Sequence, residues 1–427
     1  MQDARLPSVA VATVGHHRSG KTTVTAALHR LLADRGAAAL SVSELDRRSG
    51  SPPVVYHDGG IAFRGAPKIE GEVTESTTVR SPKITYASSA RRYVHIDCPG
   101  YRSWYKNSAR GQAVADAILL VVSAPDAVQA QTREHLIVAR GLGIRDVLVF
   151  LNKCDRVADL EWLDLVERDV RELLDEVGFD GDRTRILRGA AERALDGEGP
   201  WAASLHDLAD ALDTELPPRP PAPSGPPLLY LDSVQARLGD GPRVLVQGRL
   251  RRGTLRRGDR LALVGMIEST TVQVDDLEVF HQKVEVAEAG DQLGLLISRP
   301  QVRLMRSQVL SGQALVGGHA ATTAGIRIRL RLLRASDGGR HTAIHPGHQG
   351  LFVFGASLQM GTIVGLERAL EPGDEADVWV RLLAPLYLEP GMPVLLRDGA
   401  QGHQRLHGGP PLWAGTAGYG TVTAVGV

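Results

Sequence analysis

The chain has 427 residues, which is enough for about three domains of ordinary size. Its 49 basic and 49 acidic residues cancel, so no overall positive field draws the protein towards nucleic acid. Any contact with RNA must therefore come from a local basic surface, and we expect no DNA partner.

The sequence gives no sign of secretion, membrane insertion or disulfide bonding. The first residues lack a charged segment followed by a long apolar one, and no run approaches the ~18 apolar residues of a membrane span. The two cysteines, Cys98 and Cys154, each lie inside a candidate nucleotide-binding motif, where a disulfide is not expected. We therefore expect a cytoplasmic protein that binds no membrane.

Strand and helix patterns alternate over the first 216 residues. An apolar run at 8–14 predicts a buried strand, and apolar residues at helical spacing from Val24 to Leu32 predict a helix after it. Further strands are predicted at 93–96, 117–122 and 147–151, and helices at 131–140 and 161–177. This order predicts a doubly wound α/β domain, with a parallel sheet covered by helices on both faces, over residues 1–216.

A change of pattern follows residues 217–227, whose sequence PPRPPAPSGPP predicts a stiff extended linker. Beyond it, short β-like runs are separated by glycine-containing turns, which is typical of β-barrels. A boundary near Leu315 gives one barrel over 228–315 and a second over 316–427. The runs lie at 244–250, 260–264, 271–274, 293–298, 326–333, 350–355, 376–383 and 420–425.

The first chemical motif is the run Gly15-His16-His17-Arg18-Ser19-Gly20-Lys21-Thr22, followed by Thr23. It fits the phosphate-binding pattern G-x-x-x-x-G-K-[ST], in which glycines admit a phosphate to the backbone N–H groups at a helix N-terminus. Lys21 is expected to reach the β- and γ-phosphates, and the Thr22 hydroxyl to bind Mg²⁺. The alternative is a chance match in a glycine-rich chain, against which the strand–loop–helix context argues.

The second motif, Asp97-Cys98-Pro99-Gly100, follows the predicted strand at 93–96. An acidic residue at this end of a strand suits a water-mediated contact with Mg²⁺, so Asp97 is a candidate metal residue. Gly100 is placed to offer its N–H group to a γ-phosphate. Taken alone, the D-x-x-G pattern occurs often by chance.

The third motif, Asn152-Lys153-Cys154-Asp155, follows the predicted strand at 147–151. A carboxylate accepts hydrogen bonds from the ring N–H and the exocyclic amine of guanine, a donor pair that adenine lacks, so Asp155 would select GTP over ATP. Three such motifs in this order, each at a strand end, predict a site for GTP or GDP with Mg²⁺.

The stretch Tyr93 to Gly100, YVHIDCPG, resembles the elongation factor Tu family of translational GTPases. So do QTREH at 131–135, FLNKCD at 150–155 and GGRHT at 338–342. The resemblance implies a G domain followed by two β-barrels, acting as a monomeric, GTP-switched carrier of aminoacyl-tRNA to the ribosome, with a nucleotide exchange factor as a further partner. It also implies that Thr78 binds Mg²⁺ in the GTP state and that Gly189, Ala190 and Ala191 contact the guanine.

Two departures from the family concern hydrolysis. The family has a histidine after D-C-P-G that positions the attacking water, whereas this chain has Tyr101, which cannot become a cation near neutral pH. We expect hydrolysis to be impaired or performed differently. Arg18 and Ser19 replace an aspartate and a histidine of the phosphate loop. An arginine beside the phosphates can accelerate hydrolysis by roughly 10³–10⁵-fold, so Arg18 is a second catalytic candidate, with a solvated loop arginine as the alternative.

The segments that would meet RNA and effectors are only partly retained. Residues 46–72 are longer than usual in the family, which indicates an altered effector loop before Thr78. Lys106, Asn107 and Arg340 match residues that face tRNA in the family, but Ser298 and Gly415 stand where the family has arginines. Each lost phosphate contact weakens RNA binding, so the sequence permits tRNA binding without guaranteeing it.

These observations favour a specialised GTPase paralogue that carries aminoacyl-tRNA. The alternative is a GTP-dependent switch with little hydrolysis that acts on a non-ribosomal protein or on a partner in tRNA-dependent biosynthesis. A sulfate-activating GTPase is a third possibility, against which the GGRHT segment argues. A selenocysteine-specific factor is expected to carry a further C-terminal domain, and an initiation-type relative to carry extra metal-binding cysteines.

Overall fold

A computed structural model describes residues 6–34, 83–100, 105–195, 199–216, 223–234, 243–279, 282–299, 306–318, 320–398 and 416–426, and the backbone of 54–57 and 60–63. The chain divides into two compact units, mainly 1–140 with 144–221 and mainly 222–277 with 284–427, and each is described by itself. No helix in the described part of the chain is long and apolar enough to cross a membrane.

The first unit is built on a six-stranded sheet with the order β4-β5-β1-β6-β7-β8. Strands β1 (Ser8–Val14), β5 (Arg92–Asp97), β6 (Ala117–Ser123), β7 (Asp146–Asn152) and β8 (Ile186–Arg188) run parallel to one another. All seven residues of β6 are buried, as expected for a central strand that is covered on both faces. The α/β fold class predicted from the sequence is confirmed.

Although the sequence predicts a parallel sheet, the sheet is not wholly parallel, because the unpredicted strand β4 (Lys83–Ala87) runs antiparallel to β5. A tight turn joins the two strands, in which the Ser88 N–H donates to the Arg91 carbonyl at 2.8 Å. Strands joined by so short a turn must be antiparallel, since a parallel connection needs a crossover of a dozen residues or more. The sheet is therefore mixed, with β4 at one edge.

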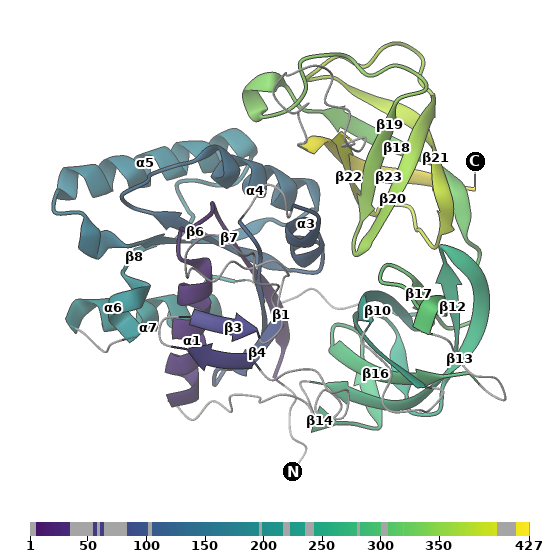
Figure 1. The fold of residues 1–427 in the computed structure, drawn as a ribbon, viewed down its shortest axis with the longest axis horizontal. Coiled ribbons are helices and arrows are strands. Elements are labelled where there is room, and N and C mark those ends of the chain that lie inside the picture. The colour runs from purple at the N-terminus through teal and green to yellow at the C-terminus, as the bar shows by residue number, and fades with distance from the viewer. Residues whose placement is uncertain are drawn as a thin grey trace, which may run out of the picture. The chain divides into compact units, whose positions relative to one another are not determined.

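Helices cover both faces of this sheet (Figure 1): α1 (Lys21–Asp34), α6 (Ala191–Leu195) and α7 (Gly199–Thr214) on one, and α3 (Tyr105–Ala113), α4 (Ala130–Gly141) and α5 (Leu160–Val177) on the other. Leu28 of α1 and Leu208 of α7 pack with Phe150 of β7 in one buried cluster. Helix α5 begins where the Asp159 side chain accepts the Glu161 N–H, and it ends at Gly178, whose φ of 92° is left-handed.

Part of the long segment at 46–72 has regular backbone structure. Strands β2 (Val54–His57) and β3 (Gly60–Phe63) pair antiparallel, with Val54 opposite Phe63. The rest of this segment, together with Thr78, lies outside the described residues.

The second unit contains two closed barrels, as the sequence predicted. In the first, the strand order β12-β17-β9-β10-β16-β13 is closed by the pairing of β12 with β13. These strands are β9 (Leu228–Val234), β10 (Arg243–Arg252), β12 (Arg260–Gly265), β13 (Ile267–Val279), β16 (Gln292–Ser298) and β17 (Ala314–Val316). Strand β14 (Gln282–Lys283) extends from β13, and β11 (Thr254–Arg256) pairs separately with β15 (Val286–Glu288).

The second barrel closes in the order β18-β21-β20-β19-β22-β23. Its strands are β18 (Thr323–Leu332), β19 (Gln349–Phe354), β20 (Ser357–Gly365), β21 (Glu375–Leu386), β22 (Pro393–Asp398) and β23 (Thr416–Val425). Along β18, Ile326, Ile328, Leu330 and Leu332 are buried while the residues between them are arginines. This strict alternation is the pattern of a strand with one face on an apolar core and one towards water.

Candidate functional site

The loop between β1 and α1 has the backbone shape that its glycines predict. Gly15 and Gly20 have φ angles of 143° and 92°, a region that residues with a side chain rarely adopt. A Cβ atom on Gly15 would lie 2.2 Å from the Val121 carbonyl oxygen, so only glycine fits there. Arg18 has a φ of 64° without being glycine, which places modest strain in the middle of the loop.

Lys21, the first residue of α1, is buried and points its ammonium group back into this loop. The Nζ atom donates a hydrogen bond of 2.7 Å to the His16 carbonyl. Burial lowers the pKa of Lys21 to about 8, although Asp97 acts in the opposite direction. Gly100 lies directly beside this ammonium group, because a Cβ atom there would come within 2.4 Å of Nζ. A buried cation in a cradle of backbone fits a phosphate group.

Thr22 and Asp97 meet on the same side of the loop. The Thr22 hydroxyl donates to Asp97 Oδ2 at 2.6 Å, and Asp97 is wholly buried at the end of β5. A hydroxyl and a carboxylate are oxygen ligands of the kind that Mg²⁺ prefers, so this pair fits the expected metal. Thr23 follows on α1, and Cys98 and Pro99 lie between Asp97 and Gly100. The remaining switch residues, Thr78 and Tyr101, lie outside the described part of the chain.

The Ser19 side chain is a buried polar group of the loop. It is fully buried, and its hydroxyl has no hydrogen-bond partner within the described part of the chain. A buried polar atom without a partner is costly. It is one more indication that the loop is shaped to surround a polar ligand.

The Asn152 side chain connects the phosphate loop to residues 189–191, the base-side loop, which the sequence predicts to contact the guanine base. Its side-chain nitrogen donates to the Ser19 carbonyl at 2.9 Å, and its side-chain oxygen accepts the Ala191 N–H at 3.0 Å. Gly189 donates to the Leu151 carbonyl at 2.9 Å and accepts from the Cys154 N–H at 3.0 Å. The structure thus brings together three of the segments that the sequence singled out, with Ala190 between Gly189 and Ala191.

Lys153 and Asp155 follow Asn152 in the chain and contact neighbouring segments. Lys153 has a left-handed φ of 62°, and its Nζ atom donates to the Arg18 carbonyl at 2.6 Å. Burial lowers the pKa of Lys153. Asp155 forms an ion pair of 3.4 Å with Arg193 of α6, a residue that the sequence analysis missed. Nothing in the spacing of Arg193 relates it to Asp155, because the two meet only through the fold.

Helix α4 supplies two further residues to the loop that sequence reasoning did not assign. The Gln131 side chain accepts the His17 N–H at 3.1 Å. His135, one helical turn further on, is buried and receives a hydrogen bond of 3.3 Å from Gln112 Nε2 at its Nδ1 atom. Burial lowers the pKa of His135 to about 3, so this ring stays neutral at physiological pH.

The residues expected to face RNA lie in separate parts of the fold, in helix α3 and in the two barrels. Lys106 and Asn107 belong to α3, and their side chains lie outside the described structure. Arg340 pairs with Asp398 and bonds to the Thr342 carbonyl and hydroxyl, both at 3.0 Å, so its guanidinium is engaged within its own barrel. Ser298 donates to Asp275 Oδ1 at 2.9 Å.

Residues 6–218 match the model of the elongation factor Tu GTP binding domain. The matched range contains all the loops described above, from Gly15 to Ala191.

Proposed function

Because the chain belongs to the family of translational GTPases related to elongation factor Tu, we propose that it is a GTP-dependent carrier of aminoacyl-tRNA to the ribosome. The observation that carries the proposal is the set of bonds that Asn152 makes to Ser19 and Ala191, which joins the phosphate side and the base side of one site. In this proposal the G domain covers residues 1–216, the linker 217–227, and the barrels 228–315 and 316–427.

The loop residues divide into those for phosphate, metal and base. The loop from Gly15 to Thr23 and the segment from Asp97 to Gly100 would surround the phosphates of GTP or GDP, with Lys21 as the buried cation. Thr22, Asp97 and Thr78 would hold Mg²⁺, which when bound neutralises phosphate charge. Segments 152–155 and 189–191 would hold the guanine, with Asp155 as the selecting carboxylate.

Two residues of this chain are proposed to set the rate of GTP hydrolysis. Tyr101 would position the attacking water only by hydrogen bonding, because a phenol has no cationic form. The exposed side chain of Arg18 starts from the phosphate loop itself and is proposed to stabilise charge on the transferring phosphate. The presence of both Tyr101 and Arg18 supports a paralogue with its own hydrolysis chemistry.

Binding of aminoacyl-tRNA is the direct test of the carrier function. The purified protein would be loaded with a non-hydrolysable GTP analogue or with GDP and titrated with aminoacyl-tRNA in a gel-shift assay at low salt. Binding only in the GTP-analogue state is expected. Equal binding in both states, or none in either, would contradict the carrier function.

A second function is favoured by Tyr101 and by the engagement of Arg340 with Asp398. It is a GTP-dependent switch with little hydrolysis, acting on a protein outside the ribosome or on a partner in tRNA-dependent biosynthesis. Turnover of GTP with and without ribosomes separates the two, since a carrier is stimulated by ribosomes. The Tyr101→His variant should turn over faster if the phenol is what limits hydrolysis.

A further inference from the structure

Strand β8, which leads into the base-side loop, is held by the sheet on one side only. It has three residues and lies at the sheet edge, where it pairs with β7. Its last residue, Arg188, directly precedes Gly189, whose backbone is bonded to Leu151 and Cys154. Any movement of the end of β8 therefore moves the loop beside Asn152 and Asp155.

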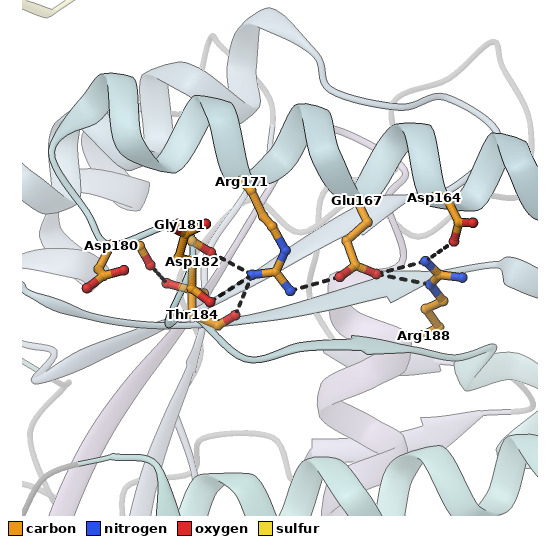
Figure 2. A network of polar contacts seen from close by, with 8 residues as sticks. All are labelled: Asp164, Glu167, Arg171, Asp180, Gly181, Asp182, Thr184 and Arg188. Atoms are coloured by element: carbon orange, nitrogen blue, oxygen red, sulfur yellow. Dashed lines mark hydrogen bonds and ion pairs between the residues drawn. The ribbon is translucent and has the colours of Figure 1, made fainter.

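The side chain of Arg188 supplies a second anchor for this strand end, on helix α5. Its Nη2 atom lies 2.6 Å from Asp164 Oδ1 and 2.9 Å from Glu167 Oε2, and its Nε atom lies 3.1 Å from the same Glu167 oxygen (Figure 2). The side chains of Arg188 and Glu167 are only 34% and 23% exposed. Charge-assisted bonds from a planar guanidinium fix orientation as well as distance.

Helix α5 also holds the loop that precedes β8, through Arg171. Glu167 accepts a bond of 2.8 Å from Arg171 with its second carboxylate oxygen. Arg171 in turn donates to the carbonyls of Gly181 at 2.5 Å and Thr184 at 3.1 Å (Figure 2). Arg171 thus fixes the loop that enters β8, whereas Arg188 fixes the end that leaves it towards the base.

We propose that Arg188 is a positioning residue for guanine recognition, which holds Gly189, Ala190 and Ala191 against Asn152 through its ion pairs with Asp164 and Glu167. The inference rests on the proposed guanine-nucleotide site and adds the element that keeps its base side closed. Without the guanidinium, the end of β8 keeps its main-chain bonds and the packing of Leu187 but loses its link to helix α5. The loop then opens more often and the nucleotide leaves faster.

Release of a fluorescent GDP analogue from the full-length protein tests this role. Arg188→Gln removes the anchor, and Arg171→Gln is the matched control, because it removes a guanidinium from the same network at a distance from the base-side loop. We expect Arg188→Gln to speed release by about 10-fold and Arg171→Gln to leave it within about 2-fold of the parent. Arg188→Lys should fall between them, since an ammonium keeps the charge but loses the paired geometry.

A second readout separates base-side positioning from general loosening of the domain. Release is measured with Mg²⁺ and again after chelation, and the acceleration caused by Arg188→Gln should be the same in both conditions. If that variant does not fold, Asp164→Asn serves instead, because the Asp164 side chain is 70% exposed. It should speed release about 2- to 3-fold.

Equal release rates in the Arg188 and Arg171 variants would overturn the positioning role. So would an acceleration that disappears after chelation, which would place the lesion on the phosphate side. Failure of the parent protein to retain the GDP analogue is a different result, because it would remove the guanine site itself.

Discussion

The side-chain nitrogen of Asn152 donates a hydrogen bond of 2.9 Å to the main-chain carbonyl of Ser19. The two residues are 133 positions apart in the chain, and both are buried. One amide therefore fastens the loop after β7 to the loop after β1. Because the same side chain also accepts the Ala191 N–H, it joins three loops.

Replacing Asn152 with alanine should disconnect these loops. A buried carbonyl and a buried N–H lose their partner, at a cost of roughly 1–3 kcal/mol each, so we expect weaker GDP binding by at least 10-fold and a lower free energy of unfolding. Calorimetric titration and urea unfolding measure the two effects. Asn152→Asp is the control, since it keeps the acceptor for Ala191 but loses the donor for Ser19. Unchanged GDP affinity in Asn152→Ala would refute the bridging role.

The buried charge of Lys21 is expected to lower the free energy of unfolding of the nucleotide-free protein at neutral pH. Burial lowers its pKa from 10.5 to about 8, so the folded state loses this proton at lower pH than the unfolded state. The contribution is destabilising below pH 8, and the stability rises as the pH increases from 8 towards 10.5. We expect Lys21→Met to abolish nucleotide binding while raising the free energy of unfolding at pH 7 by roughly 1–3 kcal/mol.

Urea unfolding of both proteins without nucleotide checks this pH dependence. The difference between Lys21→Met and the parent should shrink as the pH is raised from 7 to about 10, because the parent loses the buried charge. A constant difference across that range, or a variant that is less stable at pH 7, would contradict it.

Arg18 offers a substitution that separates backbone strain from chemistry. If its side chain stabilises the transition state, Arg18→Ala should slow single-turnover GTP hydrolysis by about 10-fold or more. Arg18→Gly is the control, because glycine accepts the φ of 64° without strain. Arg18→Gly should slow hydrolysis as much as Arg18→Ala does. Its free energy of unfolding in urea should be about 1 kcal/mol higher than that of Arg18→Ala. Single-turnover rates equal to the parent in both variants would reduce Arg18 to a solvated loop residue.

Arg340 is expected to matter first for the stability of the last barrel. It pairs with Asp398, and both charged side chains are at most 15% exposed. Arg340→Ala should lower the free energy of unfolding by roughly 2–3 kcal/mol, since it leaves the shielded Asp398 carboxylate with only His348, 3.0 Å from its other oxygen, beside it. The exposed Arg331 of β18 provides the control. Arg331→Ala should change the free energy of unfolding by less than about 0.5 kcal/mol. Equal unfolding midpoints for the two variants would show that Arg340 is free for other contacts.

Much of the fold was predictable because its signals are local. Continuous apolar runs such as Ala117–Ser123 give buried parallel strands, and alternation such as that of Thr323–Leu332 gives barrel strands. The antiparallel edge strand Lys83–Ala87 was missed because it is short and its turn, built by Ser88 hydrogen bonds, has no Asn-Gly or Asp-Gly signature.

The candidate site was predictable only where chemistry fixes residue type at fixed spacing. The phosphate loop, Asp97 and Asn152 could be found this way, since each motif lies at the end of a strand. The pairing of Asp155 with Arg193 and the support of His17 by Gln131 could not. Those contacts depend on tertiary packing between segments that show no shared sequence pattern.

The central claim is that these loops form a site for guanine in which Asp155 reads the base. Asp155→Asn tests it most directly, because an amide donates where xanthine carries a carbonyl and guanine an amine. Competition binding with GDP, xanthosine diphosphate and ADP would be measured for both proteins. We predict that the variant loses about 100-fold or more in GDP affinity and gains affinity for xanthosine diphosphate, while ADP stays weak for both. A variant that keeps the parent's preference for GDP would contradict the account.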